Sequence, residues 1–261
     1  MGNKLILGGV IVLLGIILLG GYYYMGSQEE VVLINTISQG VLTVGTNTPY
    51  EPMEYVDENG MYAGYDIDVI KNIAKNLGLT VVFKEYVWEE LFESLSNKEV
   101  DVIISAITIT SERSESMLFS IPYFNGGQSI VVKKTNTDII SEINLESKKI
   151  AVGSGTIGED EAKKYTSSDL VIGFDDIELA FDSLIADEVD AVIVDYIVAS
   201  VEVGQHEELK LAGEPFTQEY YGIATSLENR DLIENINYQI REMTREGDFS
   251  KLQVKWFTKD S

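Results

Sequence analysis

A pair of similar segments, 89 residues apart, most strongly constrains the fold of this chain. Residues 92–95 and 99–104 read FESL and EVDVII, and residues 181–184 and 188–193 read FDSL and EVDAVI. In each copy a helical segment precedes an apolar run of the kind that forms a buried strand. Any helix followed by a strand converges partly on such a pattern. Two units that match without a gap nevertheless favour two lobes built on one β-α-β plan.

Apolar runs and helical stripes alternate through most of the chain, which predicts an α/β fold with largely parallel sheets. We expect strands at residues 41–44, 80–83, 100–107, 150–152, 171–174 and 191–194. We expect helices at residues 67–77, 88–95, 177–185, 232–243 and 249–257. The repeat superposes Ser105 and Ala106 on Val194 and Asp195, at the ends of two strands. Since open α/β sheets bind ligands outside the carboxyl ends of their strands, both pairs are expected to face one cleft.

Composition excludes several classes of protein. The 261 residues include 43 acidic and 19 basic side chains, for a net charge of −24, which argues against binding to nucleic acid. The chain has no cysteine, so disulfides, thiolate metal sites and cysteine nucleophiles are impossible. One histidine, His206, cannot form a histidine metal cluster, and no calcium-loop or nucleophile-elbow motif is present. We expect no metal and no cofactor.

The uncharged segment at residues 5–24 is long enough, at about 1.5 Å per residue, to cross a bilayer's hydrocarbon core. Lys4 precedes it and acidic residues follow it, so the rest of the chain is expected outside the cytoplasm. An uncleaved anchor is favoured over a cleaved signal peptide, because no small-residue cleavage site stands near residues 20–27. A buried core helix is the third alternative.

Two charged residues follow predicted strands. Arg113 lies in the first turn of a helix that Thr110 or Ser111 can cap, where a cation opposes the helix dipole. It can hold a carboxylate in a bidentate contact, or it can be a solvated side chain beside Glu112 and Glu115. Asp195 is the single charge after four apolar residues, and it can face the cleft or cap the next helix.

Residues 153–158 match G-x-G-x-x-G after a strand. Acidic residues 159–161 would crowd a pyrophosphate at that helix start, so a dinucleotide is disfavoured. A smaller anion such as a carboxylate fits the same segment better.

From about residue 40 to residue 257 the chain resembles the type II periplasmic solute-binding proteins that serve polar amino-acid ABC transporters. The stretches that carry this resemblance are residues 44–50 (VGTNTPY), 64–68 (GYDID), 100–113 (VDVIISAITITSER), 119–123 (FSIPY), 152–156 (VGSGT), 189–195 (VDAVIVD), 220–224 (YYGIA) and 255–257 (KWF).

The resemblance implies a monomeric two-lobed fold that closes on a ligand about two hinge strands. The composition of the N-terminal part predicts a membrane or signal segment at residues 1–26 and a stalk at 27–39, and the resemblance places a first lobe at 40–122 and 222–261. Hinges are expected at 123–127 and 217–221, and a second lobe at 128–216. The implied partners are a free amino acid, an ABC transporter permease and, through the N-terminal helix, the membrane.

The resemblance also implies roles for individual residues. Arg113 clamps the ligand's α-carboxylate with help from Thr108 and the backbone at Thr156 and Ile157, and Asp195 receives the α-ammonium. Tyr50 and Trp88 sandwich the ligand's side chain. The full set of expected ligand-binding residues is Asn47, Tyr50, Trp88, Ala106, Thr108, Arg113, Thr156, Ile157 and Asp195.

Some positions depart from the family pattern. Asn47 is neutral where an acidic residue is common, and Ala106 and Ile157 stand where glycine is common. The neutral Asn47 disfavours a strong contact to a basic side chain there, but Tyr50 and Trp88 can hold a cationic side chain by cation–π contact, and the acidic surface steers cations inward. A polar or basic amino acid is the expected ligand, and the chain is not expected to be an enzyme. A dehydratase for prephenate or arogenate on the same fold and a ligand-sensing ectodomain are the alternatives.

Overall fold

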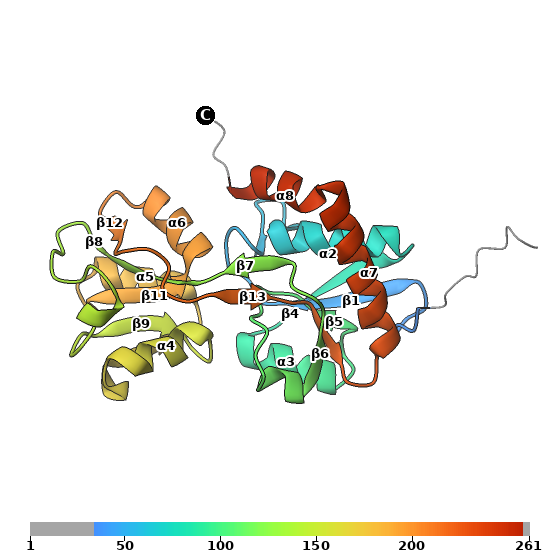
Figure 1. Ribbon diagram of the computed structural model, residues 1–261, viewed down its shortest axis with the longest axis horizontal. Helices are drawn as coiled ribbons and strands as arrows, with labels where there is room; N and C mark the ends of the chain where they lie inside the picture. The colour runs from blue at the N-terminus through green and yellow to red at the C-terminus, as the bar shows by residue number, and fades with distance from the viewer. Residues whose placement is uncertain (1–33, 258–261) are drawn as a thin grey trace, which may run out of the picture. The chain divides into compact units, whose positions relative to one another are not determined.

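Two five-stranded sheets organise the computed structural model, which describes residues 34–257 (Figure 1). Each sheet with its helices is referred to below as a lobe. The strand orders are β4-β1-β5-β14-β6 in the first lobe and β10-β9-β11-β8-β12 in the second. In both sheets the first three strands run parallel, and the last two join by antiparallel pairings. The two lobes thus share one topology, as the 89-residue repeat predicts.

The first lobe holds the sheet strands β1 (Val41–Thr46), β4 (Thr80–Glu85), β5 (Val102–Ile103), β6 (Met117–Phe119) and β14 (Ala224–Ser226). A small ribbon pairs β2 (Tyr55–Val56) with β3 (Tyr62–Ala63). The helices are α2 (Tyr65–Asn76), α3 (Trp88–Ser96), α7 (Arg230–Glu246), α8 (Asp248–Phe257) and the single 3₁₀ turn η1 (Arg113–Glu115).

The second lobe holds β8 (Gln128–Lys133), β9 (Ile150–Gly153), β10 (Val171–Phe174), β11 (Ala191–Asp195) and β12 (Leu209–Leu211). Its helices are α4 (Ile157–Tyr165), α5 (Ile177–Ile185), α6 (Tyr196–Gln205) and the 3₁₀ turns η2 (Glu142–Asn144) and η3 (Ser168–Leu170).

Two strands connect the lobes. β7 (Phe124–Gly126) pairs antiparallel with β13 (Glu219–Tyr221), and the pair forms a ribbon between the two sheets (Figure 1). The chain thus crosses between lobes twice, at neighbouring positions.

The core of each lobe follows from the side-chain period of its elements. In the second lobe, alternate residues of β8, β9 and β11 fall into two separate apolar clusters, because successive side chains of a strand point to opposite faces. In the first lobe, the stripe on α7 is buried, as its helical spacing predicts: Leu232, Ile233, Ile236, Ile240 and Met243. α7 ends at Gly247, whose φ of 73° is the left-handed conformation of a helix stop.

The predicted strand at residues 100–107 is wrong in its length. Only Val102 and Ile103 belong to the ladder as β5, and the chain then leaves the sheet. The backbone N–H of Ala106 donates to the side chain of Asp66 at 2.7 Å instead of to a neighbouring strand. This side-chain bond ends the strand and turns residues 105–108 toward the gap between the lobes.

The helix predicted after Thr110 is also shorter than expected. It is the single turn η1, and the Thr110 hydroxyl accepts a hydrogen bond from the Arg113 N–H at 3.1 Å. A three-residue turn has little dipole, so the helix-dipole argument for Arg113 does not hold.

The predicted membrane or signal helix at residues 5–24 lies outside the described residues. Among residues 34–257, no helix combines the length and the apolar character needed to cross a bilayer. The last part of the predicted stalk, from Asn35, is bonded to the first lobe. Ile37 N–H donates to Asp101 at 2.7 Å, and the backbone carbonyl of Asn35 accepts from Asn229.

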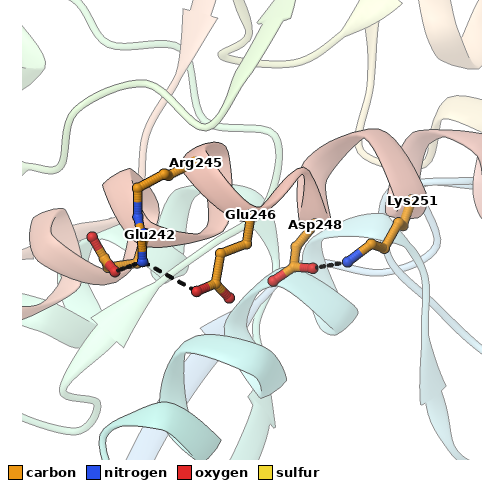
Figure 2. A network of polar contacts seen from close by, with 5 residues as sticks. All are labelled: Glu242, Arg245, Glu246, Asp248 and Lys251. Atoms are coloured by element: carbon orange, nitrogen blue, oxygen red, sulfur yellow. Dashed lines mark hydrogen bonds and ion pairs between the residues drawn. The ribbon is translucent and has the colours of Figure 1, made fainter.

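Exposed ion pairs lie within the last turns of α7 and, separately, within the first turn of α8 (Figure 2). Arg245 contacts Glu242 at 2.5 Å and Glu246 at 3.2 Å, and Lys251 contacts Asp248 at 2.6 Å. Such surface pairs contribute between zero and about 1 kcal/mol each, so the buried stripe of α7 dominates the stability of this region.

Two substitutions on α7 test whether its buried stripe contributes more to stability than its surface ion pairs. Replacing the fully buried Ile236 by Ala is expected to lower the free energy of unfolding by about 2–5 kcal/mol, because it leaves a cavity in the core. Arg245→Ala, on the same helix, is expected to lower it by less than about 1 kcal/mol. Urea unfolding of both variants measures the difference, and equal losses would contradict this account.

Candidate ligand-binding site

A cavity of about 280 Å³ lies between the lobes. Its walls come from the segment after β1, the start of α3 and the segment after β5 in the first lobe. The second lobe contributes the ends of β9, β10 and β11 and the starts of α4 and α5. All nine residues predicted to bind ligand line this one cavity: Asn47, Tyr50, Trp88, Ala106, Thr108, Arg113, Thr156, Ile157 and Asp195. Their roles toward a ligand stay predictions.

Arg113 reaches the cavity from η1. Its guanidinium donates to the backbone carbonyl of Thr108 at 3.0 Å and lies over the rings of Trp88 and Phe92, at 5.5 and 5.2 Å from their centroids. Burial lowers the pKa of Arg113, opposed by the charge of Glu219, and an arginine remains protonated at neutral pH. Within residues 34–257 this guanidinium forms no ion pair with a carboxylate. The cavity therefore contains a partly buried positive charge that a ligand carboxylate can neutralise.

Asp195 ends β11 and occupies the N-cap position of α6, yet its carboxylate forms no bond with that helix. Oδ1 accepts from the hydroxyl of Tyr221 at 2.6 Å and from the side-chain amide of Gln128 at 2.9 Å. Oδ2 accepts from the hydroxyl of Tyr50. Of the two alternatives open in the sequence, the structure has the carboxylate facing the cleft.

The environment of Asp195 makes this carboxyl group a weak acid. Burial raises its pKa to about 7, and the charge of Glu219 acts in the same direction. The bonds from Tyr221, Tyr50 and Gln128 oppose the shift. A cation placed beside Asp195 would restore ionisation and gain a favourable contact.

The start of α4 forms the opposite wall. Thr156 is the N-cap residue, but its hydroxyl donates back to the carbonyl of Gly153 at 2.8 Å and caps no helical N–H. Helix geometry leaves the first N–H groups of α4 without intrahelical partners, which suits a small anion. The N–H of Gly155 is already taken, since it donates to Glu159 at 2.7 Å. That contact agrees with the sequence argument against a pyrophosphate here.

Two of the aromatic and hydroxyl side chains are engaged differently from the expectation. The Trp88 ring packs against the Arg113 guanidinium, and its N–H donates to the carbonyl of Gly155 in the second lobe at 3.0 Å. The Thr108 hydroxyl donates to the buried Glu219 at 2.6 Å, so its proton is not directed at a ligand.

The remaining predicted residues shape the wall. Asn47 uses its side-chain N–H on the carbonyl of Tyr86, at 2.9 Å. Ala106 has a φ of 46°, in the left-handed region that favours glycine, and its methyl group remains at the cavity surface.

Ser105 lines the cavity, as the repeat predicts, but sequence reasoning missed other lining residues, among them Gln128, Asp175 and Asp176. It also missed Tyr221, which holds Asp195 from the hinge ribbon. Gln128 reaches Asp195 because β8 runs antiparallel to β11 with these two residues directly paired. The double glycine at residues 126–127 marks this crossing, but no local pattern reveals the register. Among the described residues, no group of three His, Asp or Glu side chains is placed to hold a metal ion.

Comparisons with known proteins agree with this geometry. The family model for bacterial extracellular solute-binding proteins, family 3, matches residues 42–259. The L-cystine-binding protein TcyJ of Escherichia coli (strain K12) is 32% identical over 231 residues, covering 87% of each chain. The solved structure of an ancestral arginine-binding protein bound to arginine has a TM-score of 0.80 and 41% identity, covering 84% of this chain and 99% of that one.

A third relative connects the fold to an enzyme. The ancestral amino-acid-binding protein AncCDT-1, described as a precursor of cyclohexadienyl dehydratase, has a TM-score of 0.78 and 33% identity, covering 84% of this chain and 96% of that one. The sequence match covers most of the chain. The structure adds two sheets of equal topology, a ribbon of two crossing strands and a charged cavity between the lobes. This chain belongs to the bacterial extracellular solute-binding proteins of family 3.

Proposed function

We propose that this protein captures a free polar or basic amino acid in the cavity between its lobes and delivers it to the permease of an ABC transporter. One observation carries the proposal: among residues 34–257, the Arg113 guanidinium on one wall of the cavity forms no ion pair, and the other wall holds a buried carboxylate. The two ends of an amino-acid zwitterion complement these two charges.

The α-carboxylate of the ligand fits between Arg113 of the first lobe and the N-terminus of α4 of the second. The α-ammonium fits beside Asp195, where Tyr50 and Tyr221 already direct hydroxyl groups at the carboxylate. Each charged end is thereby held by groups from both lobes. A ligand bound in this way favours the closed arrangement by its difference in affinity for the two states.

The side-chain end of the cavity favours a cationic ligand, such as arginine, lysine or ornithine. Asp175 and Asp176 line the cavity, and the lining includes no lysine and no arginine other than Arg113 within the described residues. The net charge of −24 steers cations toward the protein. An arginine-bound structural relative at 41% identity agrees with a cationic ligand and a glutamine-bound one at 40% identity agrees with a neutral polar ligand, so the charges that line the cavity carry this choice.

The transport role needs a protein outside the cytoplasm and a moving hinge. We infer an anchor at residues 5–24, with the expected stalk between it and the lobes. The proposed lobes are 40–122 with 222–261, and 128–216, and they rotate about residues 123–127 and 217–221. The ribbon of β7 and β13 lies within these hinge segments.

Calorimetry against the twenty amino acids, ornithine and cystine tests the function. After unfolding and refolding to remove carried ligand, a cationic amino acid is expected to bind with a Kd tighter than about 1 μM, and glutamine and cystine more weakly. Tightest binding of a neutral amino acid would overturn the cationic choice alone. Binding of no amino acid would overturn the proposal.

Arg113→Ala is expected to weaken that binding by more than about 100-fold, because a buried charge loses its partner at a cost of about 3–5 kcal/mol. Arg113→Lys is expected to restore only part of the affinity, since lysine cannot form the bidentate contact. Arg245→Ala is the matched control, because it removes an exposed guanidinium from the same lobe. Calorimetry compares the three, and an affinity of Arg113→Ala within about tenfold of the wild type would exclude this role.

Affinity is also expected to depend on pH through Asp195. The pKa of this carboxyl is about 7 in the free protein, and a bound ammonium lowers it, so ligand binding releases a proton near neutral pH. Affinity should fall as pH drops below about 7, by up to about tenfold per pH unit. Asp195→Asn should bind weakly with no such dependence. Titrations in buffers of different ionisation enthalpy measure the released proton. If log affinity depends on pH equally in the wild type and in Asp195→Asn, Asp195 is not the source of that proton.

A dehydratase acting in the same cavity is the second candidate. It is favoured by the weak acid Asp195, whose pKa of about 7 suits a general acid, and by the resemblance to AncCDT-1. Incubation with prephenate or arogenate, followed by a search for the aromatic product, separates the two functions. A ligand-sensing ectodomain differs from both in requiring a signalling partner instead of a permease.

A further inference from the structure

Two buried carboxyl groups beside the cavity have no role in the proposed ligand contacts, although one of them, Glu54, is among the residues that line it. Glu54 follows the turn that carries Tyr50, and Asp66 lies in the first turn of α2, within the GYDID stretch of the family pattern. Their exposed fractions are 1% and 0%. Within the described residues neither forms an ion pair with a lysine or arginine. Two buried anions without a cation are too costly to sit side by side.

The hydrogen bonds of the two carboxyl groups indicate how the pair avoids the cost of burying two negative charges. Glu54 Oε1 accepts from the Ser105 hydroxyl at 2.6 Å. Asp66 Oδ2 accepts from the Ala106 N–H at 2.7 Å and from the Tyr123 hydroxyl at 2.8 Å. Glu54 Oε2 and Asp66 Oδ1 are both buried, and neither accepts a hydrogen bond from any described residue. The two carboxyl groups are held by the consecutive residues Ser105 and Ala106, and a proton carried by one of them and donated to the other would satisfy both free oxygens.

We propose that Glu54 and Asp66 share one proton between Glu54 Oε2 and Asp66 Oδ1, and that this pair positions residues 105–108 for ligand binding. Glu54 is the protonated member, because it accepts one other hydrogen bond while Asp66 accepts two. Glu54 and Asp66 are positioning residues, since neither is assigned a contact with the ligand.

The electrostatic surroundings agree with this assignment. Burial and the neighbouring Asp66 raise the pKa of Glu54 well above its usual range. Burial also raises the pKa of Asp66, and the donors Ala106 and Tyr123 oppose the rise. The other titratable groups facing the pair are Tyr50, Tyr65, Tyr123 and Asp195, and none of them is a cation.

The pair braces three segments of the site. Asp66 holds the backbone of Ala106 at a φ of 46°, a conformation that is strained for a residue other than glycine. Ser105, which donates to Glu54, also accepts from the N–H of Asn47 at 3.0 Å. Tyr123, which donates to Asp66, stands directly before hinge strand β7. The buried pair therefore holds three segments of the site in place: the turn at residues 47–50, the wall at residues 105–108 and the hinge.

Carbon-13 NMR tests the shared proton without any ligand. In protein labelled at the glutamate side-chain carboxyls, one glutamate is expected to remain protonated at neutral pH, and Glu54→Gln should remove that resonance alone. Glutamine keeps both contacts, because its amide donates to Asp66 Oδ1 and its oxygen accepts from Ser105. The absence of a protonated glutamate in the wild type would overturn the shared proton.

Thermal unfolding gives a second readout with a defined sign. A raised folded-state pKa means that the native state binds more protons, so stability is greatest in acid and falls as pH rises through the folded value. The midpoint of the wild type is expected to drop as pH rises from about 5 to 8, and the drop should be smaller in Glu54→Gln. An identical pH profile in this variant would contradict the proposal.

The positioning role rests on the proposed function and is tested by calorimetry with the amino acid that binds best. Asp66→Ala is expected to weaken binding by more than tenfold, whereas Glu54→Gln should stay within threefold of the wild type. Asp101→Ala is the matched control, because Asp101 is a buried carboxylate in the same lobe that accepts the N–H groups of Ile37 and Thr43 but does not line the cavity. It should lower the unfolding midpoint and leave affinity unchanged.

A double variant separates positioning from general damage. Ala106→Gly should recover part of the affinity lost in Asp66→Ala, because glycine adopts positive φ without the side-chain bond. Unchanged affinity in Asp66→Ala would overturn the positioning role. If Asp66→Ala does not fold, Tyr123→Phe removes one donor to the same oxygen, and an unaltered pH profile in that variant would count against the pair. If no amino acid binds, the proposed function fails, while the NMR and unfolding results still decide the shared proton.

Discussion

The hydrogen bonds to the Asp195 carboxylate join three parts of the molecule that are distant in sequence. Tyr50 belongs to the first lobe, Tyr221 to the hinge ribbon and Gln128 to the first strand of the second lobe. Because one buried carboxylate accepts from all three, a movement of either lobe or of the ribbon changes the solvation of that charge. The state of the cleft is thereby coupled to the ionisation of Asp195, and in the function we propose ligand capture and closure of the lobes depend on this one group.

The shared sheet topology explains why the charged groups meet at all. In both lobes the central parallel strands end toward the cavity, so the segments after β1 and β5 face the segments after β9 and β11. Because the two lobes have the same strand order, each presents the same edge of its sheet to the cavity. The residues at these two edges differ, so the two lobes contribute different charges. The first lobe supplies a cation through Arg113, and the second supplies an anion through Asp195. A zwitterion is the simplest ligand that satisfies both.

Much of this arrangement can be predicted from local patterns, because burial and helix stops leave periodic signals. The stripe on α7, the stop at Gly247 and the buried run of β11 all follow from the spacing of apolar residues and glycine. The interactions that the sequence hides are long-range side-chain bonds. The Asp66 carboxylate captures the N–H of Ala106, 40 residues away, and so shortens a strand whose composition alone predicts eight residues. Likewise, Trp88 is aromatic and lines the cavity, but only the fold reveals that its ring packs on Arg113.

The distribution of charge around the cavity is a further reason to expect a cationic amino acid instead of a neutral one. Around the cavity, Arg113 is the positive group, while Asp195, Glu219 and the Glu54–Asp66 pair supply carboxyl groups in buried positions. Proton uptake reduces this excess of negative charge, as the raised pKa values of Asp195 and Asp66 indicate. A neutral zwitterion leaves the imbalance as it was, whereas a cationic side chain offsets one more negative charge in a site where screening is weak. In the function we propose, protons and the cationic ligand therefore compete to neutralise these carboxyl groups, and the ligand displaces a proton because it also brings a carboxylate for Arg113.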